Sequence, residues 1–250
     1  MADHPFDDLT DVYEAMIDWP KRLAHEGPFY RRLFDRVGVR SIIDLACGTG
    51  RHAAMFHGWG LRVEGADVSP QMIQRARDSF GEPPGLRWVV RGFDQPIAPL
   101  EPFDAAICVG NSLALAPDLP AVRRAVKEML AAVRAGGAIV LHVLNLARLP
   151  DGPCVWQKSQ RAALPQGEAW IVKGVHRCAQ RGYVELVVTD LGTGRMQSES
   201  AALLSLEAAE LVGVARQSGA AQVDCFGGYQ DQPFDARESP DLILVARRAS

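Results

Sequence analysis

Residues 43–53 read IDLACGTGRHA, and this stretch decides the fold. Its apolar start predicts a buried strand. Gly48, Gly50 and Ala53 then match the G-x-G-x-x-G/A turn, which lets a ligand approach the backbone between a strand and a helix. A lone match is weak evidence, because any tight strand-to-helix turn uses glycine. Here a helical stretch follows, and Asp67 ends the next strand candidate, so the stretch predicts a ligand site.

Short β-branched runs alternate with amphipathic stretches on both sides of this turn. Because parallel strands need a crossover between them, the alternation predicts βαβ units and a Rossmann-like, doubly wound α/β fold. The strand candidates are 40–46, 61–66, 86–91, 104–109 and 137–144. The helix candidates are 51–59, 70–79 and 118–135. Gly136-Gly137 is expected to end the last helix.

Two helices are expected before the first strand. They cover residues 9–19 and 28–37, with a break at Pro20. Helices in this place can cover a site at the edge of the sheet, so residues 1–38 are expected to form a lid. The aromatic candidates for that lid, which fit a plain core equally well, are Tyr13, Trp19 and Tyr30.

The chain changes character after the fifth strand. Residues 150–205 predict an antiparallel insertion that shapes the site. Its strand candidates are 170–180, 183–194 and 195–206. A helix at about 206–218 and strands at 221–229 and 241–248 follow, and these two strands complete a mostly parallel seven-stranded sheet. Since no linker separates these parts, residues 1–250 are expected to form a single domain.

Composition narrows the possible partners. The chain of 250 residues is 48% hydrophobic and 23% charged, as in ordinary globular domains. A net charge of −3 gives no reason to expect nucleic acid or an anionic membrane. The acidic start lacks the pattern of a secretory leader, and no apolar run is long enough to span a bilayer. The five cysteines are scattered, which favours reduced thiols and no metal site. We expect a cytoplasmic protein.

Asp44 points to a cationic ligand. It lies inside the first strand, where proteins that bind dinucleotides usually keep an apolar residue because a pyrophosphate comes close. A carboxylate there repels phosphate and attracts a cation. S-adenosylmethionine has no phosphate and carries a positive sulfonium and a positive ammonium, and Asp67 suits the ribose hydroxyls. The alternative for Asp44 is a carboxylate that caps backbone amides of the turn.

Several stretches, taken in order, resemble a known family. DLACGTGRHA (44–53) and VEGADVSPQMIQRAR (63–77) resemble the first two motifs of the class I S-adenosylmethionine-dependent methyltransferases. FDAAICVGNS (103–112) is similar to the fourth-strand motif of that family. Within the family, the likeness is to the glycine N-methyltransferase branch and its uncharacterised bacterial relatives. The stretches that carry it are ICVGNSLALAPD (107–118), VRAGGAIVLHVLN (133–145) and FGGYQDQPFDARESPDLILVARR (226–248).

The resemblance implies roles for individual residues. In this branch an arginine at the place of Arg22 binds the methionine carboxylate of the cofactor, although Arg22 alone also fits a solvated helix residue. Asp94 stands where the family places a polar side chain for the adenine amino group. Further cofactor contacts are implied at Ala46, Gly48, Gly50, Val68, Met72, Phe93 and Val109.

Two asparagines are candidates for catalysis. Methyl transfer needs a nucleophile in line with the methyl–sulfur bond, and a neutral amine attacks unaided. Asn111 and Asn145 follow the fourth and fifth strands, and in the family the matching residues face the acceptor. Their carbonyl oxygens could aim the lone pair of an amine, although each also fits a residue that stabilises a loop. We therefore expect methyl transfer to a small molecule, with an amine nitrogen favoured.

Three alternatives stay open. His142, in the fifth strand, is a candidate base for O-methylation, because a hydroxyl usually needs a base or a metal, although a lone histidine there more often belongs to the core. A nicotinamide-dependent oxidoreductase shares the glycine turn. A protein that binds the cofactor without catalysis is the third alternative. His52, just after the turn, is expected to face the cofactor pocket or the helix cap.

One departure from the glycine enzymes concerns the acceptor. Leu144 stands where those enzymes place an arginine that pairs with the substrate carboxylate. The change disfavours glycine and favours a less anionic or more apolar acceptor. The insertion offers replacement charges, which also fit a solvated strand face, at Arg161, Lys173, His176 and Arg177.

Overall fold

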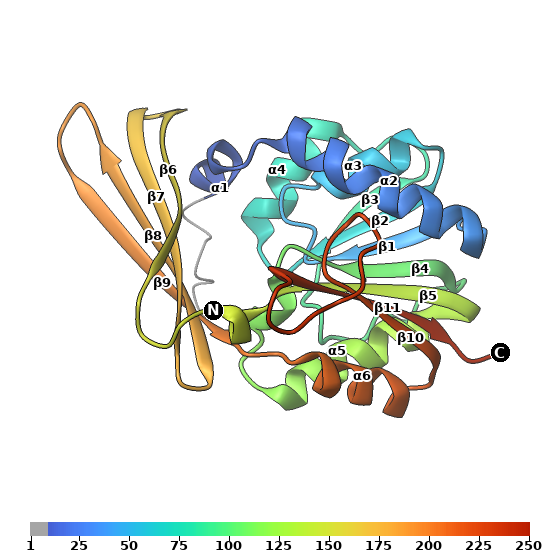
Figure 1. Cartoon of the computed structure of the whole chain (residues 1–250). Coiled ribbons are helices and arrows are strands. Elements are labelled where there is room, and N and C mark those ends of the chain that lie inside the picture. The colour runs from blue at the N-terminus through green and yellow to red at the C-terminus, as the bar shows by residue number, and fades with distance from the viewer. Residues whose placement is uncertain (1–9) are drawn as a thin grey trace.

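Two sheets make up the protein, whose computed structural model describes residues 10–250 (Figure 1). The large sheet has seven strands in the order β10-β11-β5-β4-β1-β2-β3, and a separate sheet has four strands in the order β6-β7-β8-β9. This arrangement confirms the predicted fold class. Residues 1–9 of the expected lid lie outside the described range.

The strands of the large sheet are β1 (Ser41–Leu45), β2 (Arg62–Asp67), β3 (Leu86–Val90), β4 (Phe103–Cys108), β5 (Val133–Leu144), β10 (Ala220–Phe226) and β11 (Asp241–Arg248). β1 to β5 pair in parallel, β11 is antiparallel to β5, and β10 is antiparallel to β11. β1 and β4 are buried throughout, which explains their continuous apolar runs. The strand order reverses beside β1, so a ligand site is expected at the carboxyl ends of these strands.

Helices cover both faces of this sheet (Figure 1). One face is covered by α2 (Trp19–Val37), α3 (Arg51–Gly58) and α4 (Pro70–Phe80). The other face is covered by α5 (Leu119–Ala132) and α6 (Ala208–Gln217). Each layer buries its own apolar cluster against the sheet. Hydroxyl and carboxylate caps start two of these helices, since Ser69 accepts from Met72 N and Asp118 from Ala121 N.

The predicted break at Pro20 is wrong. α1 (Thr10–Met16) ends before it, and Pro20 lies in the first turn of α2, where a missing N–H leaves no helical hydrogen bond unmade. Asp18 caps α2 by accepting a hydrogen bond from Lys21 N at 3.1 Å. Pro28, expected at the start of a second helix, lies within α2 with an exposed side chain.

The Gly136-Gly137 pair also has a different place from the predicted one. α5 ends at Ala132 and β5 begins at the next residue, so the glycines lie inside the strand. Gly136 has a φ of 68°, and the β4–β5 register shifts at this point, as in a β-bulge. A Cβ on Gly137 would lie 2.9 Å from the backbone oxygen of Asp104. The pair therefore allows close strand contact and does not end the helix.

The insertion forms the four-stranded antiparallel sheet, made of β6 (Val155–Leu164), β7 (Gly167–Cys178), β8 (Arg181–Asp190) and β9 (Met196–Leu204). Three of these strands were expected, and β6 was missed because most of its side chains are exposed and its sequence lacks apolar alternation. α1 lies between this sheet and the large one (Figure 1). The α1 side chains Val12 and Met16 pack on Leu164, Ile171 and Leu186 of the small sheet.

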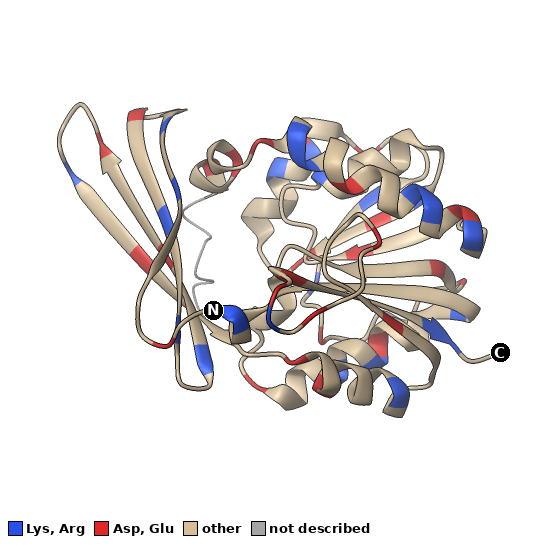
Figure 2. Ribbon diagram, in the orientation of Figure 1, with Lys and Arg blue, Asp and Glu red and all other residues tan. Residues whose placement is uncertain are grey.

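Charged residues of both signs are interspersed along the helices and outer strands in the view of Figure 2. That distribution agrees with the small net charge of −3. None of the helices within residues 10–250 is both long and apolar enough to cross a membrane.

Candidate active site

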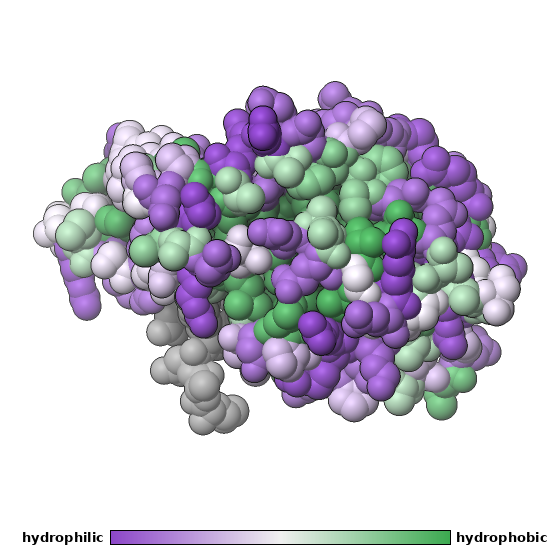
Figure 3. Space-filling view, turned by 60° about the horizontal axis from the view of Figure 1, so that its bottom comes forward, coloured by the Kyte–Doolittle hydropathy of each residue, from purple (hydrophilic) through white to green (hydrophobic). Residues whose placement is uncertain are grey.

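A cavity of about 650 Å³ opens where the strand order reverses. Residues that follow the carboxyl ends of β1, β2, β3 and β4 line it, among them Gly48, Ser69 and Asn111, and the end of β5 contributes His142 and Leu144. Side chains from α1 and the small sheet line the opposite wall, among them Tyr13 and Leu203. In the space-filling view, apolar residues gather across the middle of the face and polar residues surround them (Figure 3). The volume lies within the range of small-molecule pockets.

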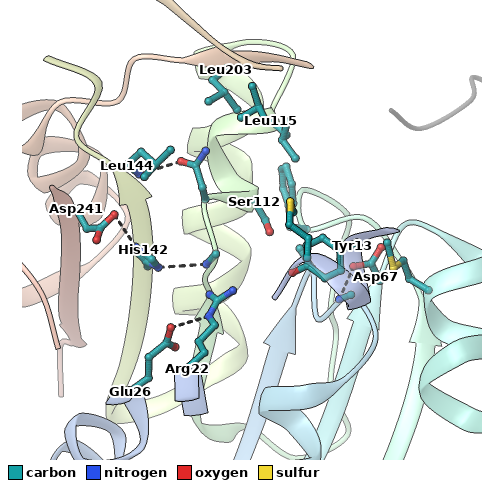
Figure 4. A pocket seen from close by; sticks show the side chains of 18 of the residues that line it. Tyr13, Arg22, Glu26, Asp67, Ser112, Leu115, His142, Leu144, Leu203 and Asp241 are labelled. Carbon is teal, nitrogen blue, oxygen red and sulfur yellow. Dashed lines mark hydrogen bonds and ion pairs between the residues drawn. The ribbon is translucent and has the colours of Figure 1, made fainter. Parts of the chain in front are cut away.

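Asp67 and Gly48 form one corner of this cavity (Figure 4). Asp67 Oδ2 accepts a hydrogen bond from Gly48 N at 2.8 Å, and Oδ1 accepts from Ser69 N at 2.9 Å. These bonds fix the carboxylate at the end of β2. Gly48 has a φ of 54°, and an added Cβ would meet only Tyr13, at 3.8 Å. The backbone there is open to a ligand, as the glycine turn predicts.

Asp44 is a buried carboxylate without a partner. It is 1% exposed, and neither oxygen makes a hydrogen bond of normal geometry within residues 10–250. Burial raises the pKa of Asp44 well above its usual range, and the charge of Asp67 raises it further, whereas Arg22 and the Ala53 amide lower it by less. The Ala53 amide in the first turn of α3 acts on this carboxylate, although neither oxygen makes a hydrogen bond of normal geometry with it. An orphaned carboxylate beside the cavity fits a ligand that brings a positive group.

Arg22 belongs to a buried ion-pair network. Its Nε donates to Glu26 Oε1 at 2.7 Å, and His52 Nε2 contacts Glu26 Oε2 at 2.7 Å (Figure 4). Burial alone would raise the pKa of Glu26, but its contacts with His52 and Arg22 outweigh this and lower it to about 2. The Arg22 guanidinium lines the cavity beside Gly110. His52 therefore faces Glu26 and does not line the cavity.

The remaining cofactor candidates fall into two groups. Those that line the cavity are Ala46, Val68, Met72, Phe93 and Asp94. Val68 exposes 42% of its surface, which leaves an apolar face for a planar ring. Asp94 Oδ2 accepts from Arg124 Nη2 at 3.2 Å, and its carboxylate is one-third exposed. Asp44, Gly50 and Val109 are not among the lining residues, and Val109 packs in the core.

Gly50 serves packing and backbone geometry at the start of α3. It has a φ of 83°, and an added Cβ would lie 2.5 Å from the Trp88 ring. The start of α3 is also occupied by a carboxylate from α1. Glu14 pairs with the Thr49 hydroxyl, and Arg51 Nε donates to Glu14 at 3.1 Å. Gly50 is therefore needed because a side chain there would collide with Trp88 and because the turn has a positive φ.

Asn111 lines the cavity with its amide turned in a defined direction. Its Oδ1 accepts a hydrogen bond from the backbone N–H of Leu144 at 2.9 Å, so the oxygen must point there and the NH₂ group is the freer end (Figure 4). The residue has a φ of 72°, a left-handed conformation that asparagine tolerates better than most residues. Asn111 thus presents its NH₂ group, a hydrogen-bond donor, to the cavity. The sequence predicted that its carbonyl oxygen would face the acceptor.

Asn145 is placed away from the cavity. Its Nδ2 donates to the backbone oxygens of Ala236 and Ser239, both at 2.9 Å, and the residue is 9% exposed. It does not line the cavity. Its side chain holds the loop before β11, which corresponds to the loop-stabilising alternative.

Both ring nitrogens of His142 face protein groups (Figure 4). Nδ1 accepts from Gly110 N at 3.3 Å and lies 3.0 Å from the Tyr229 hydroxyl. Nε2 lies 3.3 Å from Asp241 Oδ1 but lacks hydrogen-bond geometry. The side chain lines the cavity with Nδ1 held by these two groups, whereas Nε2 has no hydrogen-bond partner among the described residues.

Several polar residues that line the cavity were not predicted as site residues, among them His25, Glu26 and Asp241. The pair Arg22 and Glu26 has the i, i+4 spacing of a helical ion pair, so the sequence held a signal for Glu26. Asp241 pairs in register with Leu144, and only the antiparallel placement of β11 brings it to the cavity. The sequence around Leu144 gives no indication that Asp241 lies beside it.

Comparison with known proteins finds a family model and several curated relatives. Residues 42–137 match the model of a methyltransferase domain. The glycine/sarcosine N-methyltransferase of Parasynechococcus marenigrum (strain WH8102) is 35% identical over 152 residues, which cover 58% of this chain and 52% of that protein. Human glycine N-methyltransferase is 31% identical over 163 residues, covering 57% and 55%. The chain thus spans about half the length of the curated relatives it matches.

Solved structures share the whole fold at low identity. The CcbJ methyltransferase from Streptomyces caelestis has a TM-score of 0.79 and 22% identity, covering 98% of each chain. The sugar N-methyltransferase KedS8 from Streptoalloteichus has a TM-score of 0.75 and 21% identity, covering 91% of this chain and 88% of that one. The motifs, the fold and these matches agree. Residues 42–137 thus match a methyltransferase domain, and the chain is similar in sequence to glycine N-methyltransferases and in fold to solved methyltransferases.

Proposed function

We propose that this protein transfers a methyl group from S-adenosylmethionine to an amine nitrogen of a small molecule. The observation that carries the proposal is the charge layout at one end of the cavity. The Arg22 guanidinium presents positive charge there, Asp67 lines the same end, and Asp44 lies buried in the adjacent strand without a partner. Opposite charges of this kind suit an amino-acid group, and the Asp67 carboxylate suits ribose hydroxyls. S-adenosylmethionine supplies a methyl group activated by its sulfonium.

In this proposal the residues of the chain bind, orient and exclude water. Arg22, held by Glu26, binds the cofactor carboxylate, and Asp44 attracts its ammonium. Tyr13 and Met16 of α1 line the cavity and cover it. Excluding water strengthens these electrostatic contacts and leaves an amine acceptor as the nucleophile.

Nitrogen is favoured over oxygen because His142, the base that the sequence offered, lies among protein groups. His142 has both ring nitrogens directed at protein groups. No group of three or more His, Cys, Asp or Glu side chains within residues 10–250 is arranged to hold a metal ion. A neutral amine needs neither, whereas a hydroxyl usually requires one of them.

A nicotinamide cofactor is disfavoured by Glu14. A pyrophosphate binds at the N-terminus of the helix after the glycine turn. In this protein the Glu14 carboxylate already pairs with Thr49 and Arg51 at the start of α3. Together with Asp44, it would place two carboxylates near the phosphates.

Calorimetric titration with S-adenosylhomocysteine, with NADH as the comparison ligand, tests the cofactor. We expect micromolar binding of the former and no binding of NADH; the reverse result would overturn the proposal. Incubation with S-adenosylmethionine and a panel of primary and secondary amines, followed by mass spectrometry, tests the transfer. Products methylated only on oxygen would favour the O-methyltransferase alternative, and binding without any turnover would favour a non-catalytic binding protein.

A further inference from the structure

Lys173 presents an ammonium group to the cavity. It lies in the middle of β7 and lines the cavity together with Val184, Leu186 and Leu203 of the neighbouring strands. Within residues 10–250 its ammonium group makes no hydrogen bond and no salt bridge. An unpaired cation in a largely apolar wall is costly unless a ligand supplies an anion.

The other basic candidates of the insertion are occupied elsewhere. Arg161 pairs with Glu168 on the exposed part of the sheet, and both side chains are more than half exposed. His176 pairs with Glu185 at 2.9 Å. Arg177 donates to backbone oxygens, and none of the three lines the cavity. Of the four charges that the sequence offered, Lys173 is the one available to a ligand.

Lys158 offers an internal comparison with Lys173. The two residues are register partners on β6 and β7. Lys158 Nζ donates to the backbone oxygen of Met16 at 2.6 Å and so attaches the sheet to α1. Lys173 has no such acceptor. Of these two paired lysines, Lys158 therefore makes a structural contact with α1, whereas Lys173 faces the cavity.

The surroundings of Lys173 favour a single anionic partner. Burial lowers the pKa of Lys173, the charges of Lys158 and Arg22 lower it further, and only Asp241 raises it. The cavity walls near the insertion are apolar, and Leu144 at the end of β5 supplies no charge (Figure 4). Asp241 also lines the cavity and would repel a doubly charged group such as phosphate. A carboxylate carries one charge and accepts charge-assisted hydrogen bonds from an ammonium.

We propose that Lys173 anchors a carboxylate of the methyl acceptor, so that the acceptor is an apolar amine that carries a carboxylate. This inference rests on the proposed methyl transfer and names its acceptor class. It assigns the anion contact to β7 in place of the end of β5. The acceptor keeps an anionic group while its body contacts the apolar wall.

The test measures binding to protein saturated with S-adenosylhomocysteine. The probes are hexanoate, hexanamide and hexylamine, which share an apolar chain and differ in charge. We expect hexanoate to bind about tenfold or more tightly than hexanamide, as for a charge-assisted contact. Lys173→Met should abolish this preference, and Lys173→Arg should keep most of it. Arg161→Met removes an equal charge outside the cavity and should leave the preference unchanged.

Three outcomes would overturn the proposal. They are equal or absent binding of hexanoate and hexanamide to the wild type, tighter binding of hexylamine, and an unchanged preference in Lys173→Met. The affinity for S-adenosylhomocysteine is measured first in every variant. If Lys173→Met weakens that affinity, Lys173 serves the cofactor and the inference fails. If the wild type does not bind S-adenosylhomocysteine at all, the proposed function fails, and the two failures are thereby distinguished.

Discussion

Replacing Asp44 by Asn tests two effects of its buried charge: a lower stability of the ligand-free protein and a tighter binding of a cationic ligand. Asp44 is almost fully buried and has no hydrogen-bond partner within residues 10–250. Asn keeps the shape and removes the charge. If the carboxylate serves a cationic ligand, the Asp44→Asn protein should be more stable when ligand-free and should bind S-adenosylhomocysteine more weakly. If the carboxylate served only the fold, its replacement would lower the stability and leave the affinity for S-adenosylhomocysteine unchanged.

The expected changes in Tm and in Kd follow from the burial of the Asp44 carboxylate. Leaving a buried polar group unpaired costs about 1–3 kcal/mol, and a hydrogen bond to a charged group contributes about 1.5–3 kcal/mol. At 250 residues, 1 kcal/mol corresponds to a Tm shift of about 2–4 °C. The ligand-free Tm of Asp44→Asn should therefore rise by several degrees. Its Kd for S-adenosylhomocysteine should rise by about 10- to 150-fold.

The gain in stability should also depend on pH with a definite sign. The pKa of Asp44 is raised in the folded state, so its stabilising contribution is complete below the usual pKa of 3.8 and is lost as pH rises through the folded pKa. The advantage of Asp44→Asn over the wild type should thus grow from acidic to alkaline pH. Thermal unfolding of both proteins across that range measures it.

Asp104→Asn is the matched control. Asp104 is also buried in the large sheet, but its carboxylate accepts from Arg40 N, Ser41 N and Arg134 Nε at the opposite end of the strands. Removing that charge should lower Tm and leave the affinity for S-adenosylhomocysteine unchanged. If Asp44→Asn instead lowers Tm and binds S-adenosylhomocysteine as the wild type does, the reasoning about a cationic ligand is refuted.

Two further changes test the support around the site. Glu26→Gln frees Arg22 and should weaken S-adenosylhomocysteine binding about tenfold in calorimetry. Because the folded pKa of Glu26 is lowered from 4.5 to about 2, the wild type should lose about 3 kcal/mol of unfolding free energy as pH falls through that window, and the variant should lack this loss. Gly50→Ala, which forces a Cβ within 2.5 Å of Trp88, should cost about 2–4 kcal/mol in urea unfolding and leave ligand affinity unchanged. Gly48→Ala has no close contact, should cost about 1–2 kcal/mol, and should weaken binding because the residue lines the cavity. Equal affinities of the two glycine variants would contradict this assignment.

The large sheet could be predicted because its strands are buried on both faces. Continuous apolar runs such as β1 and β4 need no partner to be recognised, and the helices between them fix a parallel order. β6 escaped prediction because its exposed side chains follow no apolar alternation. The Gly136-Gly137 pair misled because glycine serves a helix end and a bulge equally well, and only the pairing with β4 decides between them.

The cofactor end of the site could be predicted for a related reason. Asp67, Gly48 and Asp44 lie on the β1 and β2 ends, where neighbours in the sheet are set by the motif itself. The acceptor end depends on side chains from segments far apart in sequence. Asn145 follows β5 as expected, yet its amide binds the loop before β11, and Asn111 turns its oxygen to Leu144. Side-chain direction of this kind is not encoded in local spacing.

The groups assigned to the cofactor and the residue assigned to the acceptor lie in different parts of the protein. The groups assigned to the cofactor are held by backbone hydrogen bonds and by the buried Arg22–Glu26 pair. Lys173 stands on a separate sheet, which joins the body through α1 and through contacts such as Lys158 with Met16. Because Lys173 belongs to a different sheet from the groups assigned to the cofactor, substitutions at Lys173 should change acceptor preference more than cofactor affinity. The insertion can therefore vary its acceptor chemistry while the glycine turn stays the same.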